Sequence, residues 1–333
     1  MGNMAIALTC ADYARLMPLA SGAVRPVGIE LTMVLGREGA WASRAEMLSR
    51  ALADPTVQGG EASMARHLRR VEQGDRSYVA LPAFPLRNFT ARDIYVRRDG
   101  PVRRAADLPG RRVGLYSWAA SGSIWYRHML RFLGVEPESL TWWVGDIDTP
   151  EWSVPETGVP DFVRAPAPGR SLAQMLIDGE LDALLSPPRP RRYHPTAGPI
   201  VRLFPEFRSV EQKYFRSCGV YPPQHLIVLR RDAWLSDKSI ARALTDAFIR
   251  NNEVFAATQR SFPYASPWME AELEDVEALL GPDFHADGLE ANRATMELFA
   301  EQAHRVGITR RRVAVDEYFA EYLESPEPPG GPS

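Results

Sequence analysis

The 333-residue chain has little of what metal sites, disulfide frameworks and membrane spans are built from. It holds two cysteines, Cys10 and Cys218, and six histidines, with no His-x-x-x-His pair and no close cluster of Asp and His. This pattern provides no zinc site, so we expect no bound metal and two free thiols. No apolar run approaches the roughly 20 residues that a transmembrane helix needs, so we expect no membrane partner.

Several other classes of protein lack support for similar reasons. The chain has no glycine-rich dinucleotide pattern beside a helix, no phosphate loop and no nucleophile elbow, and we expect no cofactor. Its 39 basic and 42 acidic side chains are spread along the sequence and give a net charge of −3, which argues against a nucleic-acid partner. The first eleven residues contain no Lys or Arg, unlike a secretory signal, so we expect a cytoplasmic protein.

What is present is a regular alternation of short apolar segments and helical segments. Strand-like stretches at residues 6–9, 29–35, 57–63 and 78–81 are separated by helical ones, including residues 43–52 and 64–73. Alternation of this kind is typical of βαβ units. It predicts an α/β fold with mainly parallel sheets flanked by helices.

Changes of composition near residues 97 and 223 predict two lobes. We expect the first lobe to be discontinuous and to comprise residues 1–96 with 224–333, and the second to comprise residues 97–223. From residue 239 onward the pattern is helical. This tail is too long for the second lobe alone, so we expect its helices to cover the first.

Several motifs resemble those of the 4,5-dihydroxyphthalate decarboxylases and run in the family's order from near residue 5 to near residue 315. They include Phe84-Pro85-Leu86-Arg87-Asn88-Phe89, Glu211 with Tyr214, Gly219-Val220-Tyr221-Pro222-Pro223-Gln224-His225, and Gly288-Leu289-Glu290-Ala291-Asn292-Arg293. Two weaker segments, residues 107–114 and 178–183, resemble the wider class of type II periplasmic binding proteins. The resemblance implies the two-lobed fold of that class, with a ligand cleft between the lobes.

The resemblance also implies an activity. It points to a cofactor-independent carboxy-lyase, a decarboxylase of aromatic compound metabolism that acts on a hydroxylated acid such as 4,5-dihydroxyphthalate. Residues 116–121 and 187–195 depart from the family pattern in expected cleft loops, so the substrate does not follow from the fold. Two alternatives therefore stay open: a non-catalytic solute-binding protein, and another biosynthetic enzyme on the same scaffold. We expect the partner to be a small aromatic or carboxylate ligand. A homo-oligomer is also compatible with the sequence.

The resemblance suggests His225 and Glu61 as catalytic candidates. His225 falls within a family motif at the second connection between the lobes, and a histidine is suited to deliver a proton near neutral pH. A histidine that merely braces this connection is the alternative. Glu61 follows Gly59-Gly60 and would accept a hydrogen bond from a ligand hydroxyl or act as a base, unless it pairs with a nearby Arg.

Two further features suit an anionic ring. Residues 117–123 open a predicted helix, whose free N–H groups would bind a carboxylate, although an ordinary serine N-cap is the alternative. Arg87 is expected in a loop after the strand at 78–81, where it would face these serines and grip a carboxylate with two bonds, unless it is a solvated surface Arg. The candidate substrate-binding residues are Arg87, Ser117, Ala120, Ser121, Ser63, Thr9, Tyr116, Tyr221 and Trp118.

Overall fold

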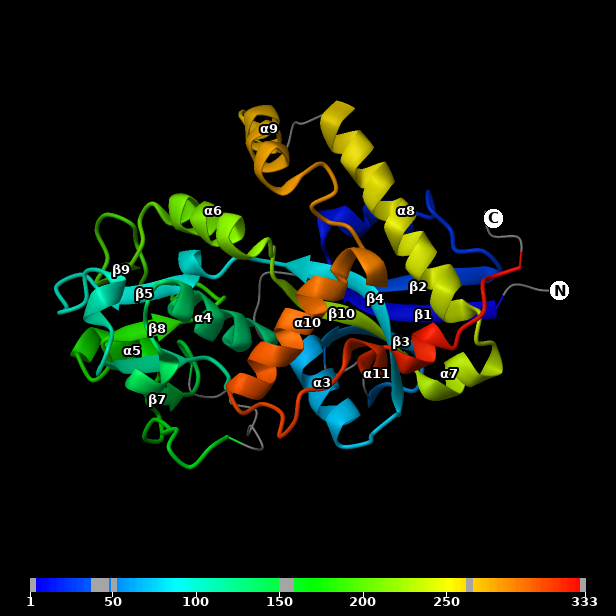
Figure 1. Cartoon of the computed structure of the whole chain (residues 1–333). Coiled ribbons are helices and arrows are strands. Elements are labelled where there is room, and N and C mark those ends of the chain that lie inside the picture. The colour runs from blue at the N-terminus through cyan, green and yellow to red at the C-terminus, as the bar shows by residue number, and fades with distance from the viewer. Residues whose placement is uncertain (1–3, 37–47, 49–52, 150–158, 262–265, 330–333) are drawn as a thin grey trace. The chain divides into compact units, whose positions relative to one another are not determined.

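The computed structural model describes residues 4–36, 48, 53–149, 159–261 and 266–329. The chain divides into two compact units, one of Met1–Arg87 with Pro223–Ser333 and one of Asn88–Pro222. Each unit contains one five-stranded sheet with helices around it (Figure 1). The helix expected at residues 43–52 falls almost entirely outside the described residues.

The sheet of the first unit has the strand order β2-β1-β3-β10-β4. Strands β1 and β2 are parallel, as are β1 and β3, whereas β10 runs antiparallel to both β3 and β4. The strands are β1 (Met4–Ala11), β2 (Ile29–Gly36), β3 (Gly59–Ser63), β4 (Tyr78–Arg87) and β10 (Pro223–Arg230). The sheet is thus mainly parallel, with one reversed strand that the chain supplies only after it returns from the second unit.

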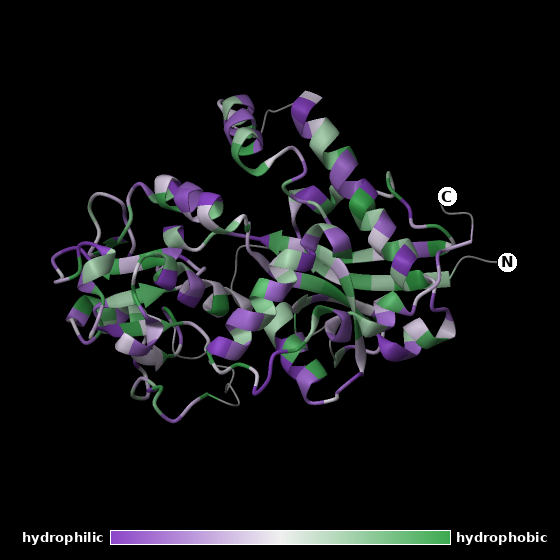
Figure 2. Ribbon diagram, viewed as in Figure 1, coloured by the Kyte–Doolittle hydropathy of each residue, from purple (hydrophilic) through white to green (hydrophobic). Residues whose placement is uncertain are grey.

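Helices from the end of the chain cover this sheet. Helix α8 contacts β4 and α1, and its buried positions include Leu244, Ala247 and Phe248. The strands of this sheet are mainly hydrophobic, while the helices carry both hydrophilic and hydrophobic residues (Figure 2). The helical elements are η1 (Ala14–Leu16), α1 (Met17–Ala20), α3 (Met64–Glu72), α7 (Arg231–Ser236), α8 (Ile240–Ser261), α9 (Met269–Leu280), α10 (Leu289–Arg305), α11 (Val315–Tyr318) and α12 (Ala320–Leu323). No helix in the described part of the chain is long and apolar enough to cross a membrane.

The sheet of the second unit has the order β7-β6-β8-β5-β9. Strand β6 is parallel to β7 and β8, while β5 runs antiparallel to β8 and β9. The strands are β5 (Ile94–Arg97), β6 (Arg112–Leu115), β7 (Thr141–Val144), β8 (Ala183–Leu185) and β9 (Ile200–Arg202). The helical elements are η2 (Ala91–Asp93), η3 (Ala105–Asp107), α4 (Ser121–Phe132), η4 (Pro137–Ser139), α5 (Leu172–Asp178) and α6 (Phe207–Cys218).

The first boundary between the units lies earlier than the composition suggests. Residues 94–96 were expected in the first lobe, but β5 pairs with β8 through Ile94 and Leu185 and with β9 through Tyr95 and Arg202. These pairings place β5 inside the second unit. The crossing points are instead Arg87 to Asn88 and Pro222 to Pro223.

Strand β4 is longer than predicted, which corrects the position of Arg87. The strand was expected to end at residue 81 because Pro82 and Pro85 follow, but it continues to Arg87, opposite Pro223. The pairing between β4 and β10 shifts register within this stretch. A bulged pairing tolerates the missing proline N–H groups, so Arg87 ends a strand and does not lie in a loop.

Two glycines allow β3 to lie close to its neighbours. A Cβ atom on Gly59 would lie 2.0 Å from the carbonyl oxygen of Val228 in β10, and one on Gly60 would lie 2.2 Å from that of Thr9 in β1. Gly60 also has a φ of +154°, which side chains rarely adopt. The Gly-Gly pair before Glu61 is therefore required by the close approach of three backbones.

We predict that Gly60→Ala lowers the free energy of unfolding by roughly 3 kcal/mol or more, because it combines a backbone clash with strain. Gly74→Ala is the matched control: Gly74 has a φ of +76° but open space around it, so it should cost only about 1–2 kcal/mol. Urea unfolding of both variants checks this. Equal losses in the two variants would contradict the role of the close approach.

Candidate functional site

The candidate site lies at one edge of the sheet of the first unit. Parallel strands β1 and β3 end here, at Ala11 and Ser63, and the reversed strand β10 begins here, with His225 opposite Ser63. The chain also leaves and re-enters the unit at this edge, at Arg87 and Pro223. In open α/β sheets the edge where parallel strands end is the usual place for a ligand.

A completely buried carboxylate forms the centre of the site. Glu61 has no solvent-exposed side-chain surface, and its two oxygens accept four hydrogen bonds. Oε1 accepts bonds from the Tyr13 hydroxyl (2.7 Å) and from Nδ1 of His225 (2.5 Å). Oε2 accepts bonds from the backbone N–H of Ala11 (3.0 Å) and the thiol of Cys10 (3.3 Å). A carboxylate with both oxygens used in this way holds its neighbours in place, and none of its side-chain surface is exposed.

These hydrogen bonds keep Glu61 ionised. Burial alone would raise the pKa of Glu61, but the hydrogen bond and charge of His225, together with the bonds from Ala11 and Tyr13, lower it to about 2. Burial, with the nearby carboxylate, raises the pKa of the Cys10 thiol well above its ordinary value, so Cys10 remains a protonated donor. The Glu61 carboxylate is therefore negatively charged near neutral pH and is surrounded by hydrogen-bond donors.

The ionised carboxylate determines which nitrogen of His225 is available. An ionised carboxylate only accepts hydrogen bonds, so Nδ1 of His225 carries a proton and donates it to Glu61. The His225 side chain keeps 13% of its surface exposed, and its Nε2 has no hydrogen-bond partner within the described part of the chain. Nε2 is therefore the ring atom left for a ligand. A histidine held through its other nitrogen in this way is a typical acid or base.

Two other candidates in the first unit, Thr9 and Ser63, form hydrogen bonds within the fold. Thr9 is 1% exposed and its hydroxyl donates to the carbonyl oxygen of Gly59 (3.5 Å). Ser63 caps α3 by accepting a hydrogen bond from the N–H of Arg66 (3.5 Å). Both side chains are close to the Glu61–His225 pair along the sheet. Contact of Thr9 and Ser63 with a ligand stays a prediction.

Arg87 is bound by the start of α10 and is not a solvated surface residue. Its guanidinium donates to the carbonyl oxygen of Ala286 (2.8 Å) and to Oδ1 of Asn292 (2.6 Å). Asn292 in turn donates to the carbonyl oxygens of Ala286 and Gly288. The motif that begins at Gly288 and the motif that contains Arg87 thus contact each other, and this contact ties the end of β4 to α10.

The remaining candidates lie in the second unit, around the start of α4. Ser121 and Trp118 are buried, whereas Tyr116, Ser117 and Ala120 are half-buried. None of the three serines of this segment caps α4 with its side chain, because the N-cap is Ala120. The alternative interpretation, an ordinary serine N-cap, is therefore wrong. The expected contact of this segment with a ligand carboxylate, opposite Arg87, stays a prediction. Tyr221 is half-buried and its ring lies 4.9 Å from that of Phe89.

Arg127 is a buried cation that the sequence pattern does not indicate. It lies in the middle of α4 and is 1% exposed. Its guanidinium carbon lies 3.7 Å from the ring centroid of Trp118 and 5.8 Å from that of Trp142, and it donates to the carbonyl oxygen of Trp118 (2.8 Å). It fixes the loop before α4, and the face of Trp118 is occupied by this cation.

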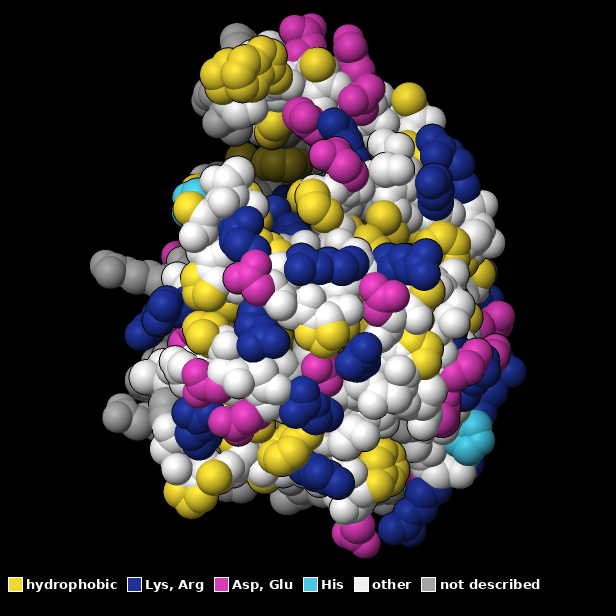
Figure 3. Space-filling model, turned by 90° about the vertical axis from the view of Figure 1, so that its left-hand side faces the viewer, with side chains coloured by type: hydrophobic (Ala, Val, Ile, Leu, Met, Phe, Trp, Pro, Cys, Tyr) yellow, Lys and Arg dark blue, Asp and Glu magenta, His cyan; other side chains and the backbone are white. Residues whose placement is uncertain are grey.

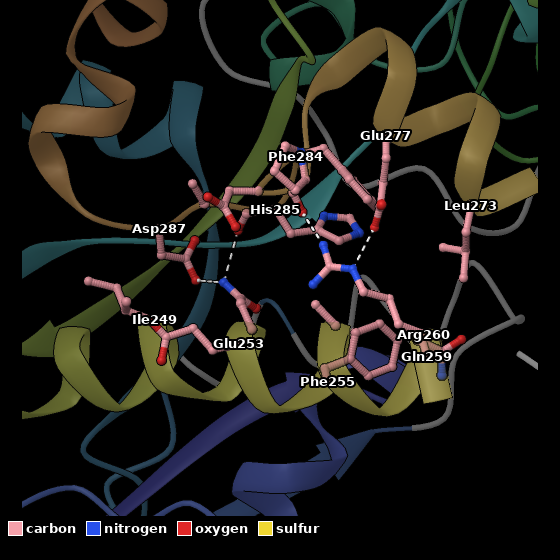
Figure 4. Close-up of a pocket in the computed structure, with 15 residues that line it drawn as sticks. Ile249, Glu253, Phe255, Gln259, Arg260, Leu273, Glu277, Phe284, His285 and Asp287 are labelled. Atoms are coloured by element: carbon pink, nitrogen blue, oxygen red, sulfur yellow. Dashed lines mark hydrogen bonds and ion pairs between the residues drawn. The ribbon is translucent and has the colours of Figure 1, made fainter. Parts of the chain in front are cut away.

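A separate cavity of about 320 Å³ lies in the first unit between α8, α9 and residues 282–287 (Figure 4). An ion pair from Arg260 to Glu277 (2.9 Å) links the two helices beside it. Burial and the charges of Arg15 and Arg87 lower the pKa of His285 to about 2, so that ring is neutral at ordinary pH. The residues that line this cavity include none of the candidate site residues.

Metal-binding groups and surface charge do not mark the candidate site or the separate cavity. Within the described residues, no group of three or more His, Cys, Asp or Glu side chains is arranged to hold a metal ion. On the face that Figure 3 draws, basic side chains are interspersed with acidic and hydrophobic ones.

No protein-family model matches the chain. The 4,5-dihydroxyphthalate decarboxylase of Comamonas testosteroni is 26% identical over 330 residues, which cover 96% of this chain and 97% of that protein. The enzyme of the same name from Pseudomonas putida is 28% identical over 201 residues, covering 57% of this chain and 73% of that protein. The resemblance to the 4,5-dihydroxyphthalate decarboxylases is confirmed.

Solved structures confirm the fold class. The periplasmic aliphatic sulphonate binding protein of Escherichia coli matches 100% of this chain and 96% of its own, with a TM-score of 0.52 at 13% identity. A periplasmic sulfonate-binding protein of Methylobacillus flagellatus matches 97% of this chain and 95% of its own, with a TM-score of 0.50 at 12% identity. The chain has a periplasmic-binding-protein-like α/β fold.

The depressed pKa of Glu61 predicts how stability depends on pH. Because the pKa falls from 4.5 to about 2 on folding, ionised Glu61 stabilises the native state above about pH 4.5, and this contribution of about 3 kcal/mol is lost as pH falls toward 2. Glu61→Gln should remove this contribution. We expect unfolding free energies measured from about pH 5.5 to about pH 3 to fall less steeply in the variant. Parallel pH dependences would show that Glu61 is not held as an anion.

Proposed function

We propose that this protein is a cofactor-independent carboxy-lyase that removes a carboxylate from a hydroxylated aromatic acid of the 4,5-dihydroxyphthalate type. The observation that carries the proposal is the Glu61–His225 pair, in which a buried anion holds a histidine with Nε2 available. Similarity over nearly the whole chain to a 4,5-dihydroxyphthalate decarboxylase supports this choice of reaction. Such a role would place the protein in aromatic compound metabolism.

The chemistry requires a proton donor and an electron-rich ring. A ring hydroxyl para to the departing carboxylate pushes electron density onto the ring carbon that bears the carboxylate. His225 Nε2 donates a proton to that carbon. The bond to the carboxylate then breaks, its electron pair restores the aromatic ring, and CO2 leaves. The proton stays on the ring, and the imidazole regains one from solvent. The reaction is therefore balanced without a redox step.

Glu61 contributes to this reaction as a positioning residue. Its bond to Nδ1 fixes the orientation of the ring, and its negative charge lies beside the imidazolium that must carry a proton on Nε2 before donating it. The low pKa of Glu61 keeps its carboxylate ionised at neutral pH, so the proton between the two side chains stays on Nδ1 of His225. We further propose that Ser117, Ala120 and Ser121 contact a ligand carboxylate, because the N-terminus of α4, which begins at Ser121, carries the positive end of the helix dipole.

Measuring CO2 release from a panel of hydroxylated benzene dicarboxylic acids tests the proposal most simply. We expect turnover of 4,5-dihydroxyphthalate or a close analogue by the purified protein with no added cofactor. Tight binding of panel members without CO2 release would instead favour a solute-binding protein. Turnover of none and binding of none would contradict both readings.

We predict that His225→Gln lowers turnover by about 10²–10⁴-fold while ligand affinity changes little, because glutamine keeps a donor but cannot titrate near neutral pH. His304→Gln is the matched control, since His304 is an exposed residue of α10. Steady-state kinetics and calorimetric binding of both variants check the prediction. If His225 merely braces the connection, turnover falls only in proportion to lost affinity or stability.

A further inference from the structure

We propose that Arg202 and Arg189 of the second unit form a binding site for a carboxylate of the aromatic acid. The group bound there is the carboxylate that remains on the ring after CO2 is lost. The inference rests on the proposed function, because that function supplies the class of ligand. It makes the protein selective for rings with a second carboxylate, and it gives a role to residues 187–195, which depart from the family pattern.

Arg202 lies at the edge of the second sheet where parallel strands end. Strands β6 and β8 are parallel, and their last residues, Leu115 and Leu185, are opposite each other. Leu185 is paired with Ile94 at the start of β5, and β9, which ends at Arg202, pairs with β5 on its other side. Residues 187–195 follow β8 at the same edge. In open α/β sheets this edge is the usual place for a ligand.

The guanidinium of the half-buried Arg202 is held in place without being neutralised. Its Nε donates to the carbonyl oxygen of Arg92 (3.0 Å). Its guanidinium carbon lies 5.0 Å from the ring centroid of Tyr193 and 4.8 Å from that of Phe207. Its terminal nitrogens, Nη1 and Nη2, form no hydrogen bond or ion pair with a described residue. The planar group is therefore oriented and keeps donors for a ligand, in the geometry that matches a carboxylate.

The acidic groups around Arg202 do not cancel its charge. The buried carboxylate of Asp93 is bound by Arg92, which donates from Nε to Oδ1 (3.0 Å) and from Nη2 to Oδ2 (3.3 Å). The Tyr95 hydroxyl also donates to Oδ1 (3.4 Å). Burial raises the pKa of Glu211, which accepts a bond from the N–H of Arg92, to about 7, so it is only partly ionised near neutral pH. Two arginines thus lie near one bound carboxylate, and the surplus charge is positive.

Arg189 places a second cation on the same aromatic ring. Its guanidinium carbon lies 5.5 Å from the ring centroid of Tyr193, which Arg202 also contacts. Arg189 is exposed and forms no hydrogen bond or ion pair with a described residue. The N–H of Tyr193 donates to the carbonyl oxygen of Pro190 (2.9 Å), and Tyr193 forms a β-bridge with Ile200 of β9. The loop is thus fixed to the strand that carries Arg202, and two guanidinium groups without a carboxylate share one ring.

The test compares 3,4-dihydroxybenzoate, the acid that remains when 4,5-dihydroxyphthalate loses one carboxylate, with its neutral counterpart 3,4-dihydroxybenzamide. We expect the calorimetric affinity of the wild type to favour the acid about 10-fold or more, because the amide offers no charge to the arginines. Arg202→Gln should lose about 10-fold in affinity for the acid and little for the amide. Arg189→Gln should reduce the same preference about 3-fold, since solvent screens its exposed charge.

Two further variants separate the shape of the guanidinium from charge in general. Arg202→Lys should recover only part of the preference, because an ammonium group lacks the fork that matches a carboxylate. Arg192→Gln is the matched control, since Arg192 is an exposed arginine of the same loop. It should keep the wild-type preference for the acid. A loss in Arg192→Gln as large as that in Arg189→Gln would show a general effect of charge and would overturn the site.

The outcomes separate this inference from the proposed function. An equal loss for both ligands in Arg202→Gln, or no loss, overturns the site whether or not the wild type releases CO2 from 4,5-dihydroxyphthalate. A preference that depends on Arg202 in a protein that releases no CO2 overturns the proposed reaction and leaves the site intact. A wild type that does not prefer the acid also overturns the site. If urea unfolding shows that Arg202→Gln has lost its structure, Arg189→Gln decides, and an unchanged preference in that variant overturns the inference.

Discussion

The burial of one carboxylate is the constraint on which the rest of the site depends. An ionised group without solvent contact is costly unless every oxygen is hydrogen-bonded, and Glu61 meets this condition with donors from three separate segments. Strand β1 supplies Cys10 and Ala11, and the turn after it supplies Tyr13. Strand β10 supplies His225. The anion is therefore stable only when these segments are assembled, and it fixes the histidine that we propose contacts the ligand.

The path of the chain gives this pair its position. Glu61 and His225 are 164 residues apart, and the whole second unit lies between them in the sequence. Strand β10 enters the sheet antiparallel between β3 and β4, so its first residues lie at the edge where the parallel strands end. Gly59 and Gly60 allow the close approach that this insertion needs. The same strand thus completes the sheet, closes the discontinuous unit and delivers the proposed acid.

Local patterns predicted the sheets and the motifs, but contacts between distant segments decided the rest. Alternating apolar segments indicated the α/β class, and the resemblance indicated His225 and Glu61. The end of β4 was misjudged because prolines normally end a strand, whereas the bulged pairing with β10 tolerates them. The burial of Arg127 depends on Trp118 and Trp142, and the hydrogen bond of Tyr13 depends on a carboxylate 48 residues away. No local signal encodes these partners.

Nitrogen-15 NMR of histidine-labelled protein tests most directly whether Glu61 holds Nδ1 of His225 and leaves Nε2 available. We expect a proton on Nδ1 of His225 that resonates at low field, as is typical of a bond to a carboxylate, and that exchanges slowly because Glu61 is buried. Glu61→Gln should abolish that signal, whereas His304→Gln should leave it unchanged. A neutral His225 protonated on Nε2, or a signal that survives Glu61→Gln, would contradict the central claim.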